Sequence, residues 1–196
     1  MLSVSCSTSV KIESGDLVFR GATQNDLSEA INEVTQTSKA TNYSHIGLCD
    51  VVDDKVIVYH SDFDRGVVKE SLEKFLNPND SLTYNVDLYR IKNITKKQVI
   101  KAISIAKQLV GESYNTTYIL EDEGYYCSEY IYELFKADSI FTLEPMTFIN
   151  PETNDFHEGW ISHYKELGIE IPQGKLGCNP NGMANSETIL FLDNLK

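Results

Sequence analysis

The chain has 196 residues, and its 29 acidic and 17 basic side chains give a formal net charge of −12. This length is enough for one domain around one hydrophobic core. Phosphate binding needs a basic face, and no run of Lys or Arg is longer than Lys96-Lys97, so the composition excludes a nucleic-acid backbone as partner. No stretch approaches the roughly 20 apolar residues that span a bilayer, which predicts a water-soluble body.

The chain is predicted to consist of a flexible segment, residues 1–13, and a single domain, residues 14–196. The first residues, Met1-Leu-Ser-Val-Ser-Cys6-Ser, resemble the end of a bacterial lipoprotein signal, with Cys6 as the lipidated residue. The alternative interpretation is an ordinary polar terminus. A signal would place the protein outside the cytoplasm, in the periplasm or anchored by lipid through Cys6, whereas a cytoplasmic location stays open under the alternative.

The first half of the chain predicts four strands and a helix. The turn residues Ser14-Gly15-Asp16 precede a β-favouring run, which indicates a strand near residues 16–20. From Asn25, apolar residues recur at the spacing of one helical face. Two apolar runs, 44–52 and 55–60, flank Asp53-Asp54 and predict a β-hairpin. Alternation over residues 82–91 predicts a further strand. The helical face that begins near Asn25 is made of Leu27, Ala30, Ile31 and Val34.

The second half predicts two helices and a long irregular segment. Thr95 and Gln98 form a capping-box pattern that starts a helix over residues 95–110, and Gly111 is expected to end it. A second helix is expected from Cys127 to about Lys136. Beyond Leu143, isolated apolar residues among Pro, Asn and Gly predict a wrap over the sheet. The buried face of the 95–110 helix is expected to contain Val99, Ile103, Ala106 and Val110.

The predicted hairpin brings two histidines together. With a two-residue turn, facing residue numbers sum to 107, so His45 lies opposite Asp62, and Gly47 lies opposite His60. Side chains alternate along a strand, so these residues share one face of the sheet, with His45 and His60 as diagonal neighbours. Gly47 leaves room for the His60 ring. The same register places Cys49 opposite Val58.

Cys127 begins a predicted helix, where unpaired backbone N–H groups and the helix dipole favour a thiolate and lower its pKa. If His45 packs against the thiol, and His60 or Asp62 fixes its tautomer, the three groups form the nucleophile, base and orienting group of a cysteine hydrolase. The Cys127 N–H is one expected donor to the oxyanion. A second donor is not indicated by the sequence.

The remaining cysteines and histidines are expected to be structural. Cys49 lies inside an apolar strand, and Cys178 lies in a Gly/Asn/Pro loop. His157 and His163 flank Trp160 in an acidic stretch and are predicted to lie on the surface. No Cys/His spacing suits a metal, so neither a metal site nor an organic cofactor is expected.

Five short motifs, in this order and at these spacings, make the chain resemble the YiiX/YebB-like proteins. These proteins are circularly permuted, papain-like cysteine hydrolases related to the NlpC peptidoglycan peptidases. The resemblance covers about residues 14–190, including Ile171-Pro172-Gln173-Gly174 and Gly177-Cys178-Asn179-Pro180 in the tail. The five motifs are Gly15-Asp-Leu-Val-Phe-Arg20, Tyr43-Ser-His-Ile-Gly-Leu48, Val58-Tyr-His-Ser61, Gly111-Glu-Ser-Tyr-Asn115 and Tyr126-Cys-Ser-Glu129.

The resemblance implies an α+β fold in which an antiparallel sheet or partial barrel packs against helices, with the nucleophile at a helix N-terminus. It implies Cys127 as nucleophile, His45 as base and acid, and His60 as the third polar residue. Many relatives carry a glutamate near the His60 position, and Asp62 is the rival orienting residue. The expected substrate contacts are Tyr43, Tyr114, Tyr125, Tyr126 and Glu129, although a packing role is equally expected for each tyrosine.

Three functions are compatible with the sequence. The first is hydrolysis of amide bonds, with peptidoglycan peptides as the expected substrate. The second keeps the same residues but takes a lipid acyl group, since the two-histidine, one-cysteine set also resembles the lecithin:retinol acyltransferase family. The third is a binding module without turnover, for which slow alkylation of Cys127 near neutral pH is expected. The sequence does not indicate the oligomeric state.

Overall fold

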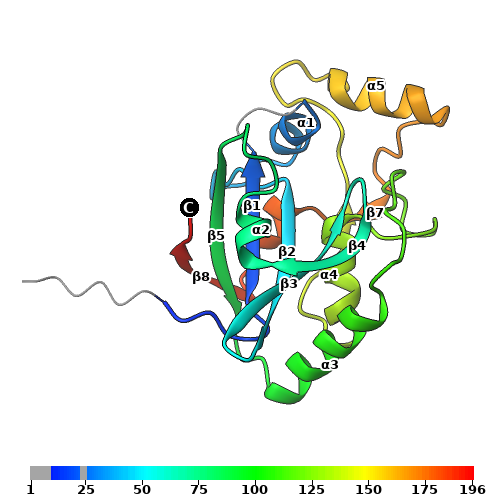
Figure 1. Cartoon of the computed structure of the whole chain (residues 1–196). Coiled ribbons are helices and arrows are strands. Elements are labelled where there is room, and N and C mark those ends of the chain that lie inside the picture. The colour runs from blue at the N-terminus through cyan, green and yellow to red at the C-terminus, as the bar shows by residue number, and fades with distance from the viewer. Residues whose placement is uncertain (1–9, 23–25) are drawn as a thin grey trace, which may run out of the picture.

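The computed structural model describes residues 10–22 and 26–196 (Figure 1). Cys6, the expected lipidation site, and Asn25, where the first helix was expected to begin, therefore lie outside the described residues. A six-stranded antiparallel sheet has the order β4-β3-β2-β1-β5-β8. Its strands are β1 (Leu17–Ala22), β2 (His45–Val52), β3 (Lys55–Asp62), β4 (Gly66–Ser71), β5 (Tyr84–Ile91) and β8 (Ile189–Asn194).

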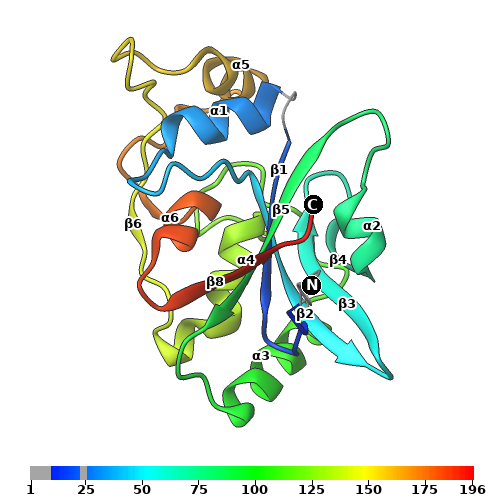
Figure 2. The ribbon, with the colours of Figure 1, turned by 90° about the vertical axis from the view of Figure 1, so that its left-hand side faces the viewer.

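Helices lie on both faces of this sheet, as Figure 2 shows for α3, α4 and α6 on one side and α2 on the other, while α1 and α5 lie beside each other at one end of it. A separate two-stranded ribbon pairs β6 (Glu144–Pro145) with β7 (Leu176–Gly177). The helices are α1 (Asp26–Val34), α2 (Leu72–Leu76), α3 (Lys96–Gln108), α4 (Cys127–Phe135), α5 (Glu158–Leu167) and α6 (Pro180–Asn185), and a 3₁₀ turn over Lys136–Asp138 follows α4.

The two faces of the sheet bury alternate residues of the same strands, as the period of two requires. On β2, Ile46 and Leu48 belong to the core that packs against α3 and α4. Cys49 instead belongs to the core that contains Phe75 of α2. The expected α+β fold is confirmed, with both sheet faces covered.

The hairpin has the predicted two-residue turn. Asp53 and Asp54 both have positive φ angles, 49° and 59°, as a type I′ turn requires. Cys49 pairs with Val58, which confirms the predicted register. A Cβ atom on Gly47 would lie 2.5 Å from Val58 and 3.4 Å from the Cβ of His60. A side chain at Gly47 would therefore displace the strand that carries His60.

The predicted helices form, with corrections at their ends. Ala30 and Val34 of α1 are buried. The Thr95–Gln98 capping box of α3 is confirmed, but the helix ends at Gln108. Val110, expected on its buried face, is 40% exposed, because it follows the last helical turn and no longer shares the helical phase.

The segment beyond Leu143 was expected to be a long wrap over the sheet, and the structure adds regular elements that this prediction lacked. It contains α5 and α6, and β8 pairs with β5 as an edge strand of the main sheet. These elements are short, and their stability comes from tertiary packing, for example of Trp160 and Met183 in the core, so local periodicity does not show them. In the described part of the chain, no helix combines the length and hydropathy needed to cross a membrane.

Candidate active site

Cys127 is the first residue of α4, whose buried face packs against the sheet. The residue is 4% exposed, and its Sγ lies 3.7 Å from the carbonyl oxygen of Ser44. The backbone N–H of Ile46 also donates toward the thiol, which lowers the thiol pKa. The thiol therefore contacts the main chain on both sides of His45, the first residue of β2.

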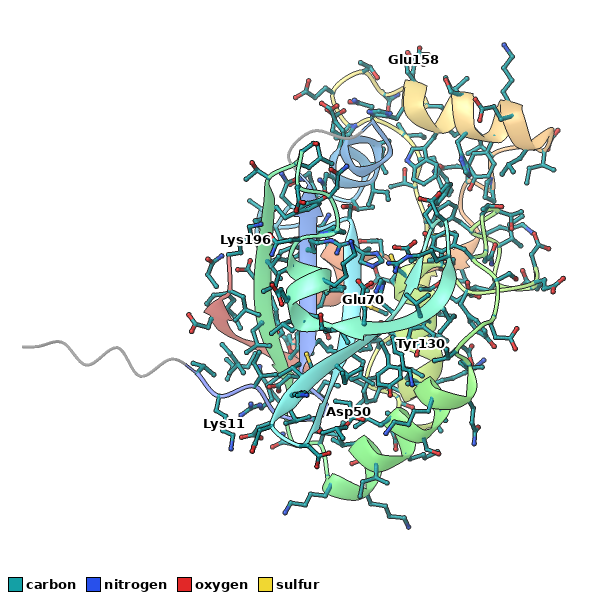
Figure 3. The ribbon with its side chains drawn as sticks, viewed as in Figure 1. Lys11, Asp50, Glu70, Tyr130, Glu158 and Lys196 are labelled. Atoms are coloured by element: carbon teal, nitrogen blue, oxygen red, sulfur yellow. The ribbon has the colours of Figure 1, made fainter. Side chains whose placement is uncertain are left out.

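The two histidines form a hydrogen-bonded relay that ends on a carboxylate. His45 Nε2 lies 2.8 Å from His60 Nδ1, and His60 Nε2 lies 3.0 Å from Glu70 Oε1. His60 is fully buried. Glu70 belongs to β4 and is labelled near the middle of the molecule in Figure 3. The predicted proximity of His45 and His60 is confirmed, and Glu70 is a member that the sequence did not indicate.

Asp62, the rival orienting residue, is engaged elsewhere. Arg65 donates to both of its carboxylate oxygens, over 3.1 and 2.9 Å. The same guanidinium also donates to Glu70 Oε2 over 2.9 Å. Burial opposes ionisation of Asp62, but the bonds from Arg65 lower its pKa below the usual value. Asp62 is thus paired with Arg65, and Arg65 is also paired with Glu70. The hydrogen-bond partner of His45 is His60 and not Asp62.

Phe75 of α2 supports both imidazoles. Its ring is stacked on His45 at 5.6 Å between centroids and contacts His60 edge-on at 5.2 Å. Arg20, which faces His45 across the β1–β2 pairing, places its guanidinium 4.5 Å above the same ring. Arg20 Nη1 also donates to the Phe75 carbonyl over 2.5 Å. These contacts restrict the rotamers of the relay.

The thiol is not activated in the resting site, which corrects the expectation from the helix start. Burial raises the pKa of Cys127 to about 11, although backbone N–H groups of Ser128 and Ile46 oppose the change. Burial also lowers the pKa of His45 well below its ordinary value, and the positive charge of Arg20 adds to this. Desolvation exceeds the helix-dipole effect here. At neutral pH both groups are uncharged.

This state predicts an unusual pH dependence of the thiol. We expect the ultraviolet thiolate absorbance of Cys127, obtained as the difference from Cys127→Ala, to rise with a midpoint near pH 11. Alkylation by iodoacetamide should be slow at pH 7 and accelerate about tenfold per pH unit, because only the thiolate reacts. A midpoint below the ~8.5 of a free cysteine would contradict this. Slow alkylation is therefore expected of an enzyme as well as of a binding module.

Two of the tyrosines expected at the substrate are core residues. Tyr43 is 2% exposed, and its hydroxyl bonds to Asp87 and Tyr89. Tyr126 is 1% exposed, and its hydroxyl accepts from the Cys178 N–H over 3.1 Å. The expectation for Tyr43 is wrong because the residue precedes β2 and turns toward the core. Tyr126 contributes to the lining of the cavity described below.

Tyr114 remains beside the nucleophile. It is half-buried, and its phenol oxygen accepts from the backbone N–H of Cys127. Its ring contacts Phe63 at 5.2 Å, and its hydroxyl lies 3.3 Å from that of Tyr118. Tyr125 is half-buried, and its carbonyl accepts a hydrogen bond from Ser61. Of the expected tyrosines, Tyr114 is therefore the one whose hydroxyl adjoins the backbone N–H of Cys127.

Glu129, expected to bind substrate, is a buried structural group. It is 3% exposed, and its Oε2 accepts from the Tyr126 N–H at 3.0 Å and from Asn115 at 3.2 Å. Burial raises its pKa to about 7, against the lowering effect of these two hydrogen bonds. Its carboxyl caps the helix that presents Cys127.

Glu129→Gln should therefore stabilise the protein in alkaline solution. The native carboxyl keeps its proton up to about pH 7, whereas the unfolded one ionises near 4.5, so stability falls between these values as pH rises. Replacement by the neutral isostere should recover about 2 to 3 kcal/mol at pH 8 and nothing at pH 4. Thermal unfolding at both pH values measures this, with Glu133→Gln on the same helix as control. Destabilisation at pH 8 would contradict it.

The two histidines expected on the surface are half-buried and engaged. His157 is the N-cap of α5, accepting from the Gly159 N–H at 3.0 Å, and its Nε2 lies 3.1 Å from Glu33. His163 Nε2 lies 2.7 Å from the Thr116 carbonyl oxygen. Both histidines join the C-terminal segment to the rest of the domain, a role that only long-range contacts reveal.

A cavity of about 460 Å³ opens beside the nucleophile. Cys127 and Ser128 line one side of it, together with Cys178, which was expected to be merely structural. Cys49, by contrast, is fully buried in the core as expected. Within residues 10–22 and 26–196, no group of three or more His, Cys, Asp or Glu side chains is arranged to hold a metal ion.

The fold and the site together define a papain-like class in which the histidine strand precedes the cysteine helix in the chain. Residues 11–192 match the family described as permuted papain-like amidase enzyme, YaeF/YiiX, C92 family. The chain belongs to this family, and it is an enzyme of the papain-like amidase type. The resemblance stated from the sequence motifs is thereby confirmed.

A solved structure supports the fold. The chain is similar to a protein whose structure is titled metalloprotein yiiX from Escherichia coli O157:H7. The TM-score is 0.75 at 17% sequence identity, and the match covers 94% of this chain and 98% of that one. A search of curated proteins by sequence finds no match.

Sequence reasoning missed Glu70, Arg65 and Phe75. A signal for Glu70 exists in retrospect, because His60 faces Val68 across the β3–β4 pairing and Glu70 follows two residues later on the same face. Residues 63–65 between these strands carry no two-residue turn signature, so this register could not be fixed beforehand.

Proposed function

We propose that this amidase cleaves its substrate through a thioester on Cys127, with His45 as base and acid and His60 as a positioning residue. One observation carries the proposal: the Cys127 thiol contacts the main chain on both sides of His45, whose imidazole is hydrogen-bonded to His60. These contacts support a proposal in which Cys127 of α4 is the nucleophile, His45 of β2 is the base and His60 of β3 orients it.

The carboxylate of Glu70 determines the tautomers in this proposal. An ionised carboxylate only accepts hydrogen bonds, so His60 donates its Nε2–H to Glu70. His60 Nδ1 is then an acceptor and receives the Nε2–H of His45. The lone pair of His45 Nδ1 is left free, and this nitrogen is the base of the proposed reaction.

The reaction then proceeds from a neutral pair. The thiol proton passes to His45 Nδ1 as sulfur forms a bond to the carbonyl carbon, and the oxygen becomes negatively charged. The carbon–nitrogen bond breaks, and the leaving nitrogen takes the proton from His45. Water next attacks the thioester while His45 accepts its proton, the carbon–sulfur bond breaks, and Cys127 regains its proton. The products are a carboxylic acid and an amine.

The oxyanion needs donors that are already in place. The backbone N–H of Cys127 is one, because no carbonyl of α4 accepts from it and the oxyanion can replace the Tyr114 oxygen as its acceptor. We assign the Tyr114 hydroxyl as the second donor, because its oxygen lies within hydrogen-bonding reach of the Cys127 N–H. Burial raises the pKa of Tyr114 well above its ordinary value, so the phenol keeps its proton and can donate it.

The family implies an amide-containing substrate. We propose peptide amides, with cell-wall peptides as the first class to test, since the sequence motifs resemble the YiiX/YebB branch. The second candidate, a lipid acyl amide or ester, is favoured by the apolar side chains in the cavity beside Cys127. Mass spectrometry of enzyme quenched during turnover tests the proposal, and it should locate the acyl group on the peptide that contains Cys127.

A further inference from the structure

The cavity beside Cys127 has a mostly apolar lining. Its volume of about 460 Å³ is within the roughly 300–1,000 Å³ typical of small-molecule sites. Thr, Ser, Asn and Gln side chains complete the lining. Of the described lining residues, Glu144 alone has an acidic or basic side chain, and it is exposed. The apolar side chains include Ile31, Phe141, Met146, Phe148, Trp160 and Met183.

The interior of this cavity is unsuited to a charged group. Phe148, Trp160 and Met183 are each 3% exposed, so a charge placed among them would lose its hydration. The described lining offers it no basic side chain, and the unpartnered Trp160 Nε1 and Thr37 Oγ1 supply only neutral hydrogen bonds. An apolar group of the same size would instead gain free energy from burial.

The position of the cavity identifies which part of the substrate enters it. Cys127 lines the cavity, but His45, His60 and Tyr114 do not. In the proposed reaction the leaving nitrogen takes its proton from His45 and must lie on that side of the carbonyl carbon. The other substituent of this carbon, the acyl group, therefore points away from His45 and toward the cavity.

We propose that this cavity is the acyl-binding site and that it selects an uncharged, apolar acyl group. The proposal rests on the proposed function for its orientation, with Cys127 and His45 in the roles given above. The apolar acyl group can come from a fatty acid or from a hydrophobic amino acid, and both present the same chemistry to these side chains. Acyl groups that carry a carboxylate, such as γ-glutamyl, are disfavoured.

A binding experiment tests this without turnover. Trp160 is the one tryptophan of the chain and lines the cavity, so its fluorescence reports occupancy. In Cys127→Ala protein, hexanamide and N-acetylleucinamide should change the fluorescence saturably. Adipamic acid, which replaces the terminal methyl of hexanamide by a carboxylate, should bind about 100-fold more weakly. The ratio between hexanamide and N-acetylleucinamide distinguishes the two sources of the acyl group.

Variants connect the binding to the cavity. Met146 is half-buried in the lining, and Met146→Lys should weaken hexanamide at least tenfold while improving adipamic acid. Ile100→Lys on α3, where Ile100 is 68% exposed and outside the lining, is the matched control. Equal binding of hexanamide and adipamic acid, or hexanamide binding that Met146→Lys leaves unaltered, overturns the proposal. Apolar binding without a thioester in the wild-type protein would instead contradict the proposed function alone.

Discussion

Replacement of Cys127 by alanine should reduce kcat/KM for an amide substrate by about 10⁴ to 10⁶-fold, as loss of the nucleophile does in other hydrolases of this logic. The loss should fall on kcat, because the cavity and the relay remain in place to bind substrate. No acyl group should be found on the variant. Rates of wild-type and variant protein on one activated amide, with mass spectrometry of both, measure these effects.

Cys178→Ala is the matched control for that experiment. Its thiol lines the same cavity, and its Sγ lies 3.8 Å from the Tyr126 hydroxyl, but it does not begin a helix. Burial also raises its pKa, to about 12. We expect less than a tenfold change in kcat from Cys178→Ala. If the two substitutions reduce kcat equally, Cys127 is not the nucleophile.

The second large effect is expected at Glu70. In Glu70→Gln the side-chain amide can donate to His60 Nε2, which would reverse the tautomers of His60 and His45 and occupy the lone pair of His45 Nδ1. We expect a loss of about 10² to 10³-fold in kcat with KM changed by only a few fold, in line with loss of a tautomer-fixing carboxylate elsewhere. Steady-state kinetics between pH 5 and 9 measure this loss.

Asp62→Asn is the control that separates the two carboxylates. Among the described residues, Asp62 makes no hydrogen bond to His45 or His60 and is linked to Glu70 through Arg65, so its neutralisation should cost less than about threefold in kcat. Circular dichroism and thermal unfolding show whether either variant is misfolded. A larger kcat loss in Asp62→Asn than in Glu70→Gln would restore Asp62 as the orienting residue and refute the tautomer assignment.

The stability of the folded protein at low pH should depend on the ionisation of Glu70. Burial opposes ionisation, but the bonds from His60 and Arg65 lower the pKa of Glu70 from 4.5 to about 2. The stabilisation is complete above pH 4.5 and is lost as pH falls toward 2, since protonation then breaks the pairing. The residue proposed to fix the tautomer also links β4 to β3 through its bond to His60.

Part of the site could be predicted because it depends on neighbours in the chain. The Asp53-Asp54 turn determines how β2 pairs with β3, and strand alternation then puts His45 and His60 on one face. The start of α4 at Cys127 follows from the apolar periodicity after it. The order of the histidine strand and the cysteine helix gives the permuted class.

The protonation state could not be predicted in this way. The helix dipole at Cys127 is a local effect and was anticipated, but the burial that exceeds it comes from the contact with Ser44 and from the core that Cys127 shares with Ile46 and Leu48. These residues lie far from Cys127 in the chain. The same reason explains the exchange of roles between Asp62 and Glu70, because Arg65 pairs with both and only the observed β3–β4 register shows where each carboxylate lies.

The sequence by itself therefore determined the family, through the order and spacing of five motifs that resemble it. It also determined the hairpin and the two groups proposed for the chemistry, since these depend on turn, cap and periodicity signals that act over a few residues. Tertiary structure alone decided the relay beyond His60, the raised pKa of Cys127 and the apolar cavity that includes Trp160. These properties depend on desolvation and on contacts between distant segments, including α5, which local periodicity does not encode.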